Sequence, residues 1–190
     1  MALRPLTAGE RKLAEKIFGT SIAYDDVQIS DKPGLPFQPM HVTMVVGNVM
    51  YTNGTYLDDY TRGSHLDRAH FVHEMTHVWQ VQNNLFNQIV AVTELQLKHK
   101  FNYAAAYYYT LDAANDLTTY GLEQQASIIE EYYLIKHEGM ASYSRHCENR
   151  GTPSQKIALF EQVLKNFLNN PSYARRDTLP PVFGKKGPKS

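Results

Sequence analysis

Two histidines four residues apart constrain this chain more than any other feature of its sequence. The segment His73–His77 reads HEMTH, with Glu74 directly after the first histidine. In a helix, residues four apart lie on one face with about 6 Å between their Cβ atoms, so both imidazoles can bind one Zn²⁺ ion. Glu74 then stands where it can act as a base toward a water molecule that the metal has acidified. The pattern predicts a helix that carries half of a hydrolytic zinc site.

The residues around this motif favour a helix. Ser64 and Asp67 match a capping box, which is typical of a helix start. We predict that apolar residues at helical spacing form a buried stripe: Leu66, Ala69, Val72, Met75 or Thr76, and Trp79. His70 lies on nearly the same face as the motif histidines, but about 10.5 Å from His77 along the axis, too far to share one zinc ion. We therefore expect His70 in the pocket or beside the ligands, unless the segment is an ordinary amphipathic helix with its polar face in water.

A catalytic zinc ion usually has three protein ligands, so the chain must supply a third. The positions after His77 lack the glycine and histidine of the HExxHxxGxxH pattern, which excludes the metzincin class. A carboxylate from a second helix is the remaining common solution. The spacing of apolar residues predicts a helix over Leu122–Tyr133, with Glu123, Ser127 and Glu130 on one face. Either glutamate can complete the site.

These motifs together resemble the gluzincin arrangement, in which an HExxH helix is followed by Glu-x-x-Ala on a later helix. Over roughly residues 5–140, the chain also resembles the small bacterial Vgr-related proteins. That resemblance rests on four segments: Leu6–Arg11, Val46–Tyr51, His73–Gln80 and Tyr120–Ala126. Those proteins are similar to a zinc-peptidase-like core domain found beside contractile injection systems such as type VI secretion.

Carried over residue by residue, the resemblance implies His73, His77 and Glu123 as zinc ligands and Glu74 as the catalytic base. Many gluzincins have an aspartate four residues after the ligand glutamate, where it hydrogen-bonds a ligand histidine. This chain has Ser127 at that position. Either the metal is held more weakly or another group takes the role of the aspartate.

Amide hydrolysis also needs a donor to the oxyanion that forms when water attacks the carbonyl. Among the tyrosines and histidines able to donate, we rank Tyr120 first because it lies three residues before Glu123. The other candidates are Tyr103, His99, His137 and His146.

Composition favours one domain over residues 1–170, followed by a flexible tail over 171–190 that contains proline, glycine and lysine. The net charge of zero gives no argument for nucleic-acid or membrane binding. Met1–Glu15 lacks the apolar run of a signal peptide, and no apolar stretch is long enough to span a membrane. We expect a cytoplasmic protein, or one exported by an injection system that uses no signal peptide.

The fold expected is α+β: an α-rich, zincin-like domain with a small β-sheet beside the two zinc-bearing helices. Strands are predicted over Val27–Ser30, His41–Val46 and Val49–Tyr51, with Gly47 and Asn48 as a tight turn, and a further helix over Ile89–His99.

The predicted activity is zinc-dependent hydrolysis of an amide bond in a peptide or protein. Cleavage of an amide in cell-wall material is an enzymatic alternative, and a non-enzymatic adaptor role in an injection apparatus is another. The resemblance implies a Vgr-type spike protein and a cognate immunity protein as partners.

Overall fold

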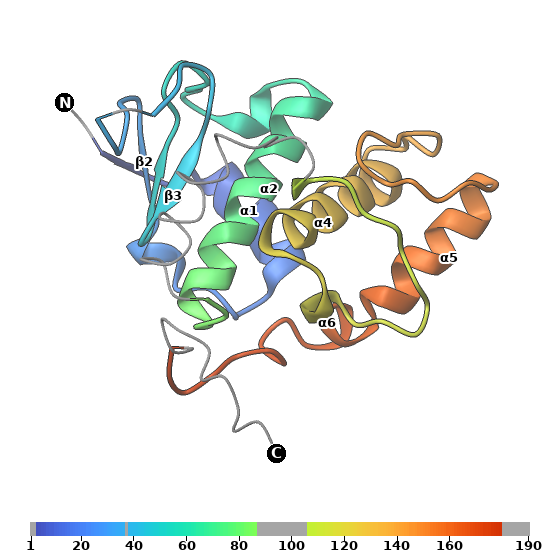
Figure 1. The fold of residues 1–190 in the computed structure, drawn as a ribbon. Helices are drawn as coiled ribbons and strands as arrows, with labels where there is room; N and C mark the ends of the chain where they lie inside the picture. The colour runs from blue at the N-terminus through green and yellow to red at the C-terminus, as the bar shows by residue number, and fades with distance from the viewer. Residues whose placement is uncertain (1–2, 37, 87–105, 180–190) are drawn as a thin grey trace.

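The chain forms a small β-sheet and a set of helices, and the computed structural model describes residues 3–36, 38–86 and 106–179 (Figure 1). The strands and longer helices are β1 Arg4–Pro5, α1 Ala8–Phe18, β2 Gln28–Ser30, β3 Met44–Val46, β4 Val49–Tyr51, α2 His65–Gln82, α4 Leu122–His137, α5 Pro153–Val163 and α6 Lys165–Asn169. Short 3-10 helices lie between them: η1 Tyr24–Asp26, η2 Tyr60–Arg62 and η4 Leu117–Thr119. Helix α2 runs between the sheet and α4 (Figure 1). The expected α+β class with a small sheet is confirmed.

The four strands form one sheet in the order β1-β2-β4-β3, with β2 and β4 parallel and the other pairs antiparallel. The predicted tight turn joins β3 to β4, and Gly47 in it has a φ of 62°. Such a two-residue turn needs a left-handed residue, which glycine adopts without steric cost. The predicted strand over His41–Val46 is wrong at its start. His41 itself has a φ of 62°, which an extended strand does not allow, and β3 begins at Met44.

Helix α2 begins at the predicted capping box. The Ser64 hydroxyl accepts a hydrogen bond from the Asp67 backbone N–H at 3.2 Å, and the Asp67 carboxylate accepts one from the Ser64 N–H at 2.7 Å. The predicted buried stripe is confirmed for four of its positions and both of its alternatives: Ala69, Val72, Met75, Thr76 and Trp79. Leu66 is the exception, because it lies in the first turn at the mouth of a cavity and is 52% exposed.

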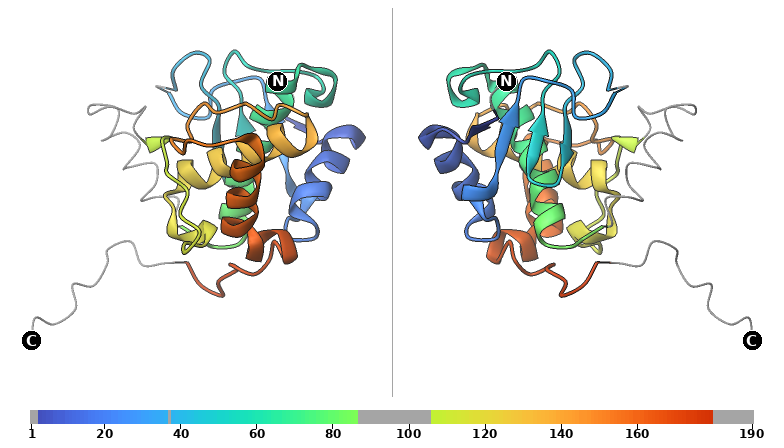
Figure 2. Two further views of the ribbon diagram at one scale, coloured as in Figure 1. Left: turned by 90° about the vertical axis from the view of Figure 1, so that its right-hand side faces the viewer. Right: turned by 90° about the vertical axis from the view of Figure 1, so that its left-hand side faces the viewer.

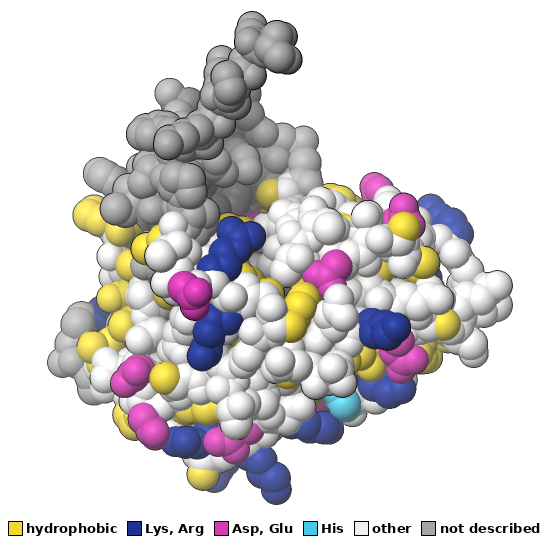
Figure 3. All heavy atoms as spheres, turned by 90° about the horizontal axis from the view of Figure 1, so that it is seen from below, with side chains coloured by type: hydrophobic (Ala, Val, Ile, Leu, Met, Phe, Trp, Pro, Cys, Tyr) yellow, Lys and Arg dark blue, Asp and Glu magenta, His cyan; other side chains and the backbone are white. Residues whose placement is uncertain are grey.

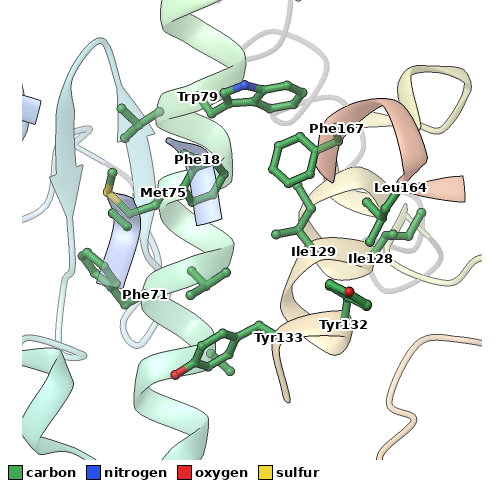
Figure 4. Close-up of a cluster of buried hydrophobic side chains, with 14 of the residues drawn as sticks. Phe18, Phe71, Met75, Trp79, Ile128, Ile129, Tyr132, Tyr133, Leu164 and Phe167 are labelled. Carbon is green, nitrogen blue, oxygen red and sulfur yellow. The ribbon is translucent and has the colours of Figure 1, made fainter. Parts of the chain in front are cut away.

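The apolar core lies on both sides of α2. Figure 4 shows Phe71 and Met75 on the side of α2 that faces the strands and Trp79 on the side that faces α4, which carries Ile128 and Ile129, and all five side chains are buried. Burying a side chain of this size stabilises the folded state by about 1.5–3 kcal/mol. This packing fixes how each helix is turned about its axis. The polar side chains of α2 and α4 therefore face each other.

The segment after α6 packs on the domain (Figure 2). The Trp79 indole N–H donates a hydrogen bond to the backbone oxygen of Pro171 at 2.8 Å. The Tyr173 hydroxyl donates to the Asp116 carboxylate at 2.6 Å. The first residues of the predicted tail, Pro171 and Tyr173, therefore contact the domain through the buried Trp79 and the half-buried Asp116.

Some predicted segments lie outside the described residues, namely the helix over 89–99 and positions 180–190 of the tail. Among the described helices, none is long and apolar enough to cross a lipid bilayer. On the face drawn in Figure 3, basic and acidic side chains are interspersed, in keeping with the net charge of zero. That face presents no broad patch of a single sign.

A buried carboxylate ties the N-terminal segment to the domain. Glu10 on α1 is fully buried and accepts hydrogen bonds from Arg4 Nη1 at 2.7 Å and Nη2 at 2.9 Å. It also accepts bonds from the backbone N–H groups of Thr7 at 2.9 Å and Tyr60 at 3.0 Å. A charge is stable at such a position only when it is paired and hydrogen-bonded, so Glu10 joins β1, α1 and η2 into one unit.

Replacing Glu10 by alanine is expected to lower the free energy of unfolding by about 3 kcal/mol, because it leaves the largely buried Arg4 guanidinium without its partner. Urea denaturation followed by circular dichroism measures the loss. The matched control is Glu15→Ala on the same helix, which removes only an exposed pair with Arg11 and should cost about 0.5 kcal/mol or less. Equal losses in the two variants would contradict the anchoring role of Glu10.

Candidate active site

Helices α2 and α4 bring two imidazoles and one carboxylate to a single point. His73 and His77 lie on α2, and Glu123 lies in the first turn of α4. The ring centroids of His73 and His77 are 5.0 Å apart, and the Nε2 atom of each ring lies 3.4 Å from Glu123 Oε2. Within the described part of the chain, this is the one group of three His, Cys, Asp or Glu residues with ligand atoms within 4.8 Å of one another.

The spacing of these atoms fits a tetrahedral metal centre. Zinc–ligand distances of about 2.0–2.1 Å at tetrahedral angles put neighbouring ligand atoms about 3.3 Å apart. Glu123 Oε2 is buried and has no hydrogen-bond partner among the described residues, although two ring nitrogens lie 3.4 Å away. Burial opposes its ionisation, but attraction to the two imidazoles outweighs burial and holds the pKa of Glu123 well below its usual range. The cluster therefore offers three converging donors of the kind that bind a divalent cation.

The second nitrogen of His73 bonds to a different glutamate. His73 Nδ1 donates to Glu130 Oε2 at 2.9 Å, and this leaves Nε2 free to face Glu123. Glu130 is buried, and despite that burial the hydrogen bond from His73 lowers the pKa of its carboxyl group. A partner of this kind fixes the ring orientation and raises the basicity of the imidazole. Glu130 therefore makes the kind of hydrogen bond to His73 that the missing aspartate would make, while the Ser127 hydroxyl is buried without a hydrogen-bond partner among the described residues.

The second nitrogen of His77 bonds to an amide. His77 Nδ1 donates to Gln80 Oε1 at 2.9 Å. Gln80 is fully buried, and its Nε2 donates to the backbone oxygen of Leu122 and to Gln125 Oε1, both at 3.0 Å. Gln80 and Gln125 were not among the site residues predicted from the sequence. The available signal was the position of Gln80 three residues after His77, one turn further along the same face.

Glu74 lies beside the cluster and lines a cavity of about 780 Å³. The residue is 5% exposed, and its Oε2 atom is buried without a hydrogen-bond partner among the described residues. Its Oε1 atom lies 3.8 Å from Nδ1 of His70, which also lines the cavity as expected. The unpartnered oxygen leaves Glu74 able to accept a proton from a molecule bound in the cavity.

The structure does not bring the Tyr120 side chain to this cavity. Its hydroxyl accepts a hydrogen bond from the backbone N–H of Asp112 at 3.0 Å and donates one to the Thr110 oxygen at 3.3 Å. Tyr120 reaches the site only through its backbone oxygen, which accepts a bond from Gln125 Nε2 at 2.7 Å. The ranking of Tyr120 as oxyanion donor used distance along the chain, and the hydroxyl points to the preceding loop instead.

Of the other predicted donors, His146 lines the cavity, and His137 at the end of α4 does not. His99 and Tyr103 lie outside the described residues. Tyr107, which the sequence analysis did not single out, stacks between two histidines: its ring centroid is 5.9 Å from that of His73 and 5.4 Å from that of His146. An aromatic row therefore leads from the cluster into the cavity.

The chain is similar to one part of a much longer protein. It is 32% identical over 167 residues to the type VI secretion system spike protein VgrG2b of Pseudomonas aeruginosa, which covers 86% of this chain and 15% of that protein. The solved effector domain of Pseudomonas aeruginosa VgrG2b matches with a TM-score of 0.65 and 28% identity, over 83% of each chain. No protein-family model matches the chain. The chain is homologous to the VgrG2b effector domain, which confirms the predicted relation to Vgr proteins.

Glu123→Ala is expected to abolish metal binding, because it removes one of three converging donors. Glu130→Ala should weaken zinc affinity by about 10- to 100-fold, since it removes only the partner of His73. Competition with a chromogenic zinc chelator measures both constants. Ser127→Ala is the matched control on the same face and should leave affinity unchanged. If Glu130→Ala loses the metal and Glu123→Ala retains it, the assignment of ligand and partner is reversed.

Proposed function

We propose that the chain is a zinc-dependent hydrolase with a zincin-like fold that cleaves an amide bond in a peptide or protein. His73, His77 and Glu123 would hold the zinc ion, and Glu74 would act as the general base. The convergence of three donor atoms next to Glu74 at the wall of a cavity carries this proposal. A structural zinc site usually has four protein ligands, whereas three ligands leave a position open for chemistry.

A zinc ion bound there would polarise the substrate carbonyl and lower the pKa of a water molecule. Glu74 takes a proton from the attacking water as the new carbon–oxygen bond forms. It then gives this proton to the amide nitrogen as the carbon–nitrogen bond breaks, so the carboxylate is restored at the end of the cycle. Glu130 and Gln80 keep the two imidazoles in the tautomer that presents Nε2. Tyr107 and His146 line the cavity in which a substrate would bind.

The role that fits this chemistry is that of an effector delivered by a contractile injection system. Similarity to the effector domain of VgrG2b, a type VI secretion spike protein, supports this role. The chain spans 15% of the length of that protein, and a Vgr-type spike protein is the first proposed partner. A producing cell that makes such a hydrolase needs protection, and a cognate immunity protein is the second proposed partner.

Glu74→Gln is expected to retain zinc and lose hydrolysis by about 10²- to 10⁴-fold, because the amide keeps the shape of the side chain but accepts no proton. Two substrates are assayed in parallel: a quenched-fluorescence peptide library and purified cell-wall material. The control is Glu161→Gln, which changes a half-exposed side chain on α5. Zinc content by elemental analysis shows that the variant is loaded.

The outcomes separate the alternatives. Turnover of peptides by the native chain and not by Glu74→Gln supports the proposal. Turnover of cell-wall material alone would show that the substrate is a cell-wall amide and not a peptide or protein. Growth inhibition of bacteria expressing the chain, with and without an added export signal, gives a second readout. A Glu74→Gln variant that inhibits growth as strongly as the native chain would refute the catalytic role and leave an adaptor.

A further inference from the structure

A row of hydroxyl groups connects the sheet to His70, one turn before the HExxH motif. His70 Nε2 lies 2.8 Å from Thr43 Oγ1, and Thr43 Oγ1 lies 2.8 Å from Thr55 Oγ1. The Thr55 hydroxyl in turn lies 2.6 Å from the backbone oxygen of Thr52. Three consecutive hydrogen bonds therefore run from a backbone carbonyl beside β4 to the imidazole of α2.

The direction of each of these bonds follows from the carbonyl at the end of the row. A carbonyl oxygen only accepts, so the Thr55 hydroxyl must donate its single proton to Thr52. Thr55 Oγ1 is then the acceptor for Thr43, whose own proton is used in that bond. Thr43 Oγ1 can then only accept in its contact with His70, so His70 Nε2 must carry a proton and donate it to this hydrogen bond. Neutral imidazole carries one ring proton, so Nδ1 of His70 has none.

That unprotonated Nδ1 faces the proposed base. It lies 3.8 Å from Glu74 Oε1, with no hydrogen bond between the two atoms. Two acceptors that face each other keep this separation, because neither has a proton to share. Once Glu74 gains a proton, the same pair becomes a donor and an acceptor. Hydrogen bonds at catalytic groups are often long before the reacting complex forms and shorten within it.

We propose that His70 is a positioning residue for Glu74: the Thr52–Thr55–Thr43 row fixes its tautomer so that Nδ1 accepts a hydrogen bond from the protonated carboxyl group. The inference rests on the proposed function for its catalytic consequence. The proton comes from the attacking water and leaves with the amide nitrogen. Between these two steps it stays on Glu74, and His70 orients the carboxyl group without taking the proton away.

The first test reads the tautomer directly and needs no activity. Nitrogen-15 NMR of histidine-labelled, zinc-loaded protein, recorded over a series of alkaline pH values, should show His70 with its proton on Nε2. The signal is assigned from its loss in His70→Leu. Thr43→Val removes the acceptor hydroxyl at similar volume and should yield a mixture of tautomers, whereas Thr43→Ser should keep the Nε2–H form. A proton on Nδ1 in the native chain, or no response to Thr43→Val, would overturn the inference.

The second test uses steady-state kinetics on the best peptide from the library. His70→Leu should lower kcat by about tenfold, the effect of roughly one lost hydrogen bond to the reacting group, with KM and zinc content unchanged. Thr43→Val should lower kcat by a smaller factor, and Thr43→Ser should match the native chain. An unchanged kcat in His70→Leu would refute the positioning role. If the native chain hydrolyses no amide, the proposed function fails, and the NMR result still decides the tautomer.

Discussion

The pairing of imidazoles with carboxylates between α2 and α4 is the constraint on which the rest of the structure depends. An ionised carboxylate without a partner is costly to bury, so Glu123 and Glu130 are stable between the helices only where His73 and His77 meet them. Glu123 gains further support from its place in the first turn of α4, since a helix N-terminus favours negative charge. These requirements fix the height of α4 against α2, and the apolar side chains around them supply the stabilisation that offsets the cost of burial.

The two histidines are held by chemically different partners. Glu130 carries a charge and accepts a hydrogen bond from His73. Gln80 is neutral; it accepts a hydrogen bond from His77 and donates one to Gln125. A charged partner raises the basicity of an imidazole more than a neutral amide does. The two imidazoles are therefore unequal in basicity as proposed zinc ligands, although they are related by one turn of the same helix.

Much of the site could be predicted because helical spacing is a local property. The capping box at Ser64 and the four-residue repeat in HExxH depend only on neighbours in the chain, and the structure contains both as α2. The partner of His73 could not be chosen from sequence, because Glu123 and Glu130 differ by almost two full turns and share a face. Only the packing of α4 against α2 decides which carboxylate meets which ring nitrogen.

The positions at which the structure differs from the prediction also depend on packing. Leu66 has the spacing of a core residue, yet the first turn of α2 extends to the mouth of the cavity and leaves it exposed. The Tyr120 hydroxyl follows the loop before α4, whose path is not encoded in the distance to Glu123. The hydrogen bond that Pro171 accepts comes from Trp79, which lies 92 positions earlier in the chain. Contacts of this range have no signature in local composition.

Two adjacent acidic residues of α4 link separate parts of the site. Glu130 bonds to His73, and the fully buried Glu131 accepts hydrogen bonds from the backbone N–H groups of Arg145 at 3.1 Å and His146 at 2.5 Å. Neighbouring side chains on a helix point about 100° apart, so one rigid rod holds a histidine of the cluster on one side and a wall of the cavity on another. A small rotation of α4 about its axis would move both together. A substitution that turns α4 would therefore alter the cavity and the His–Glu cluster at the same time, so the two could not diverge independently during evolution.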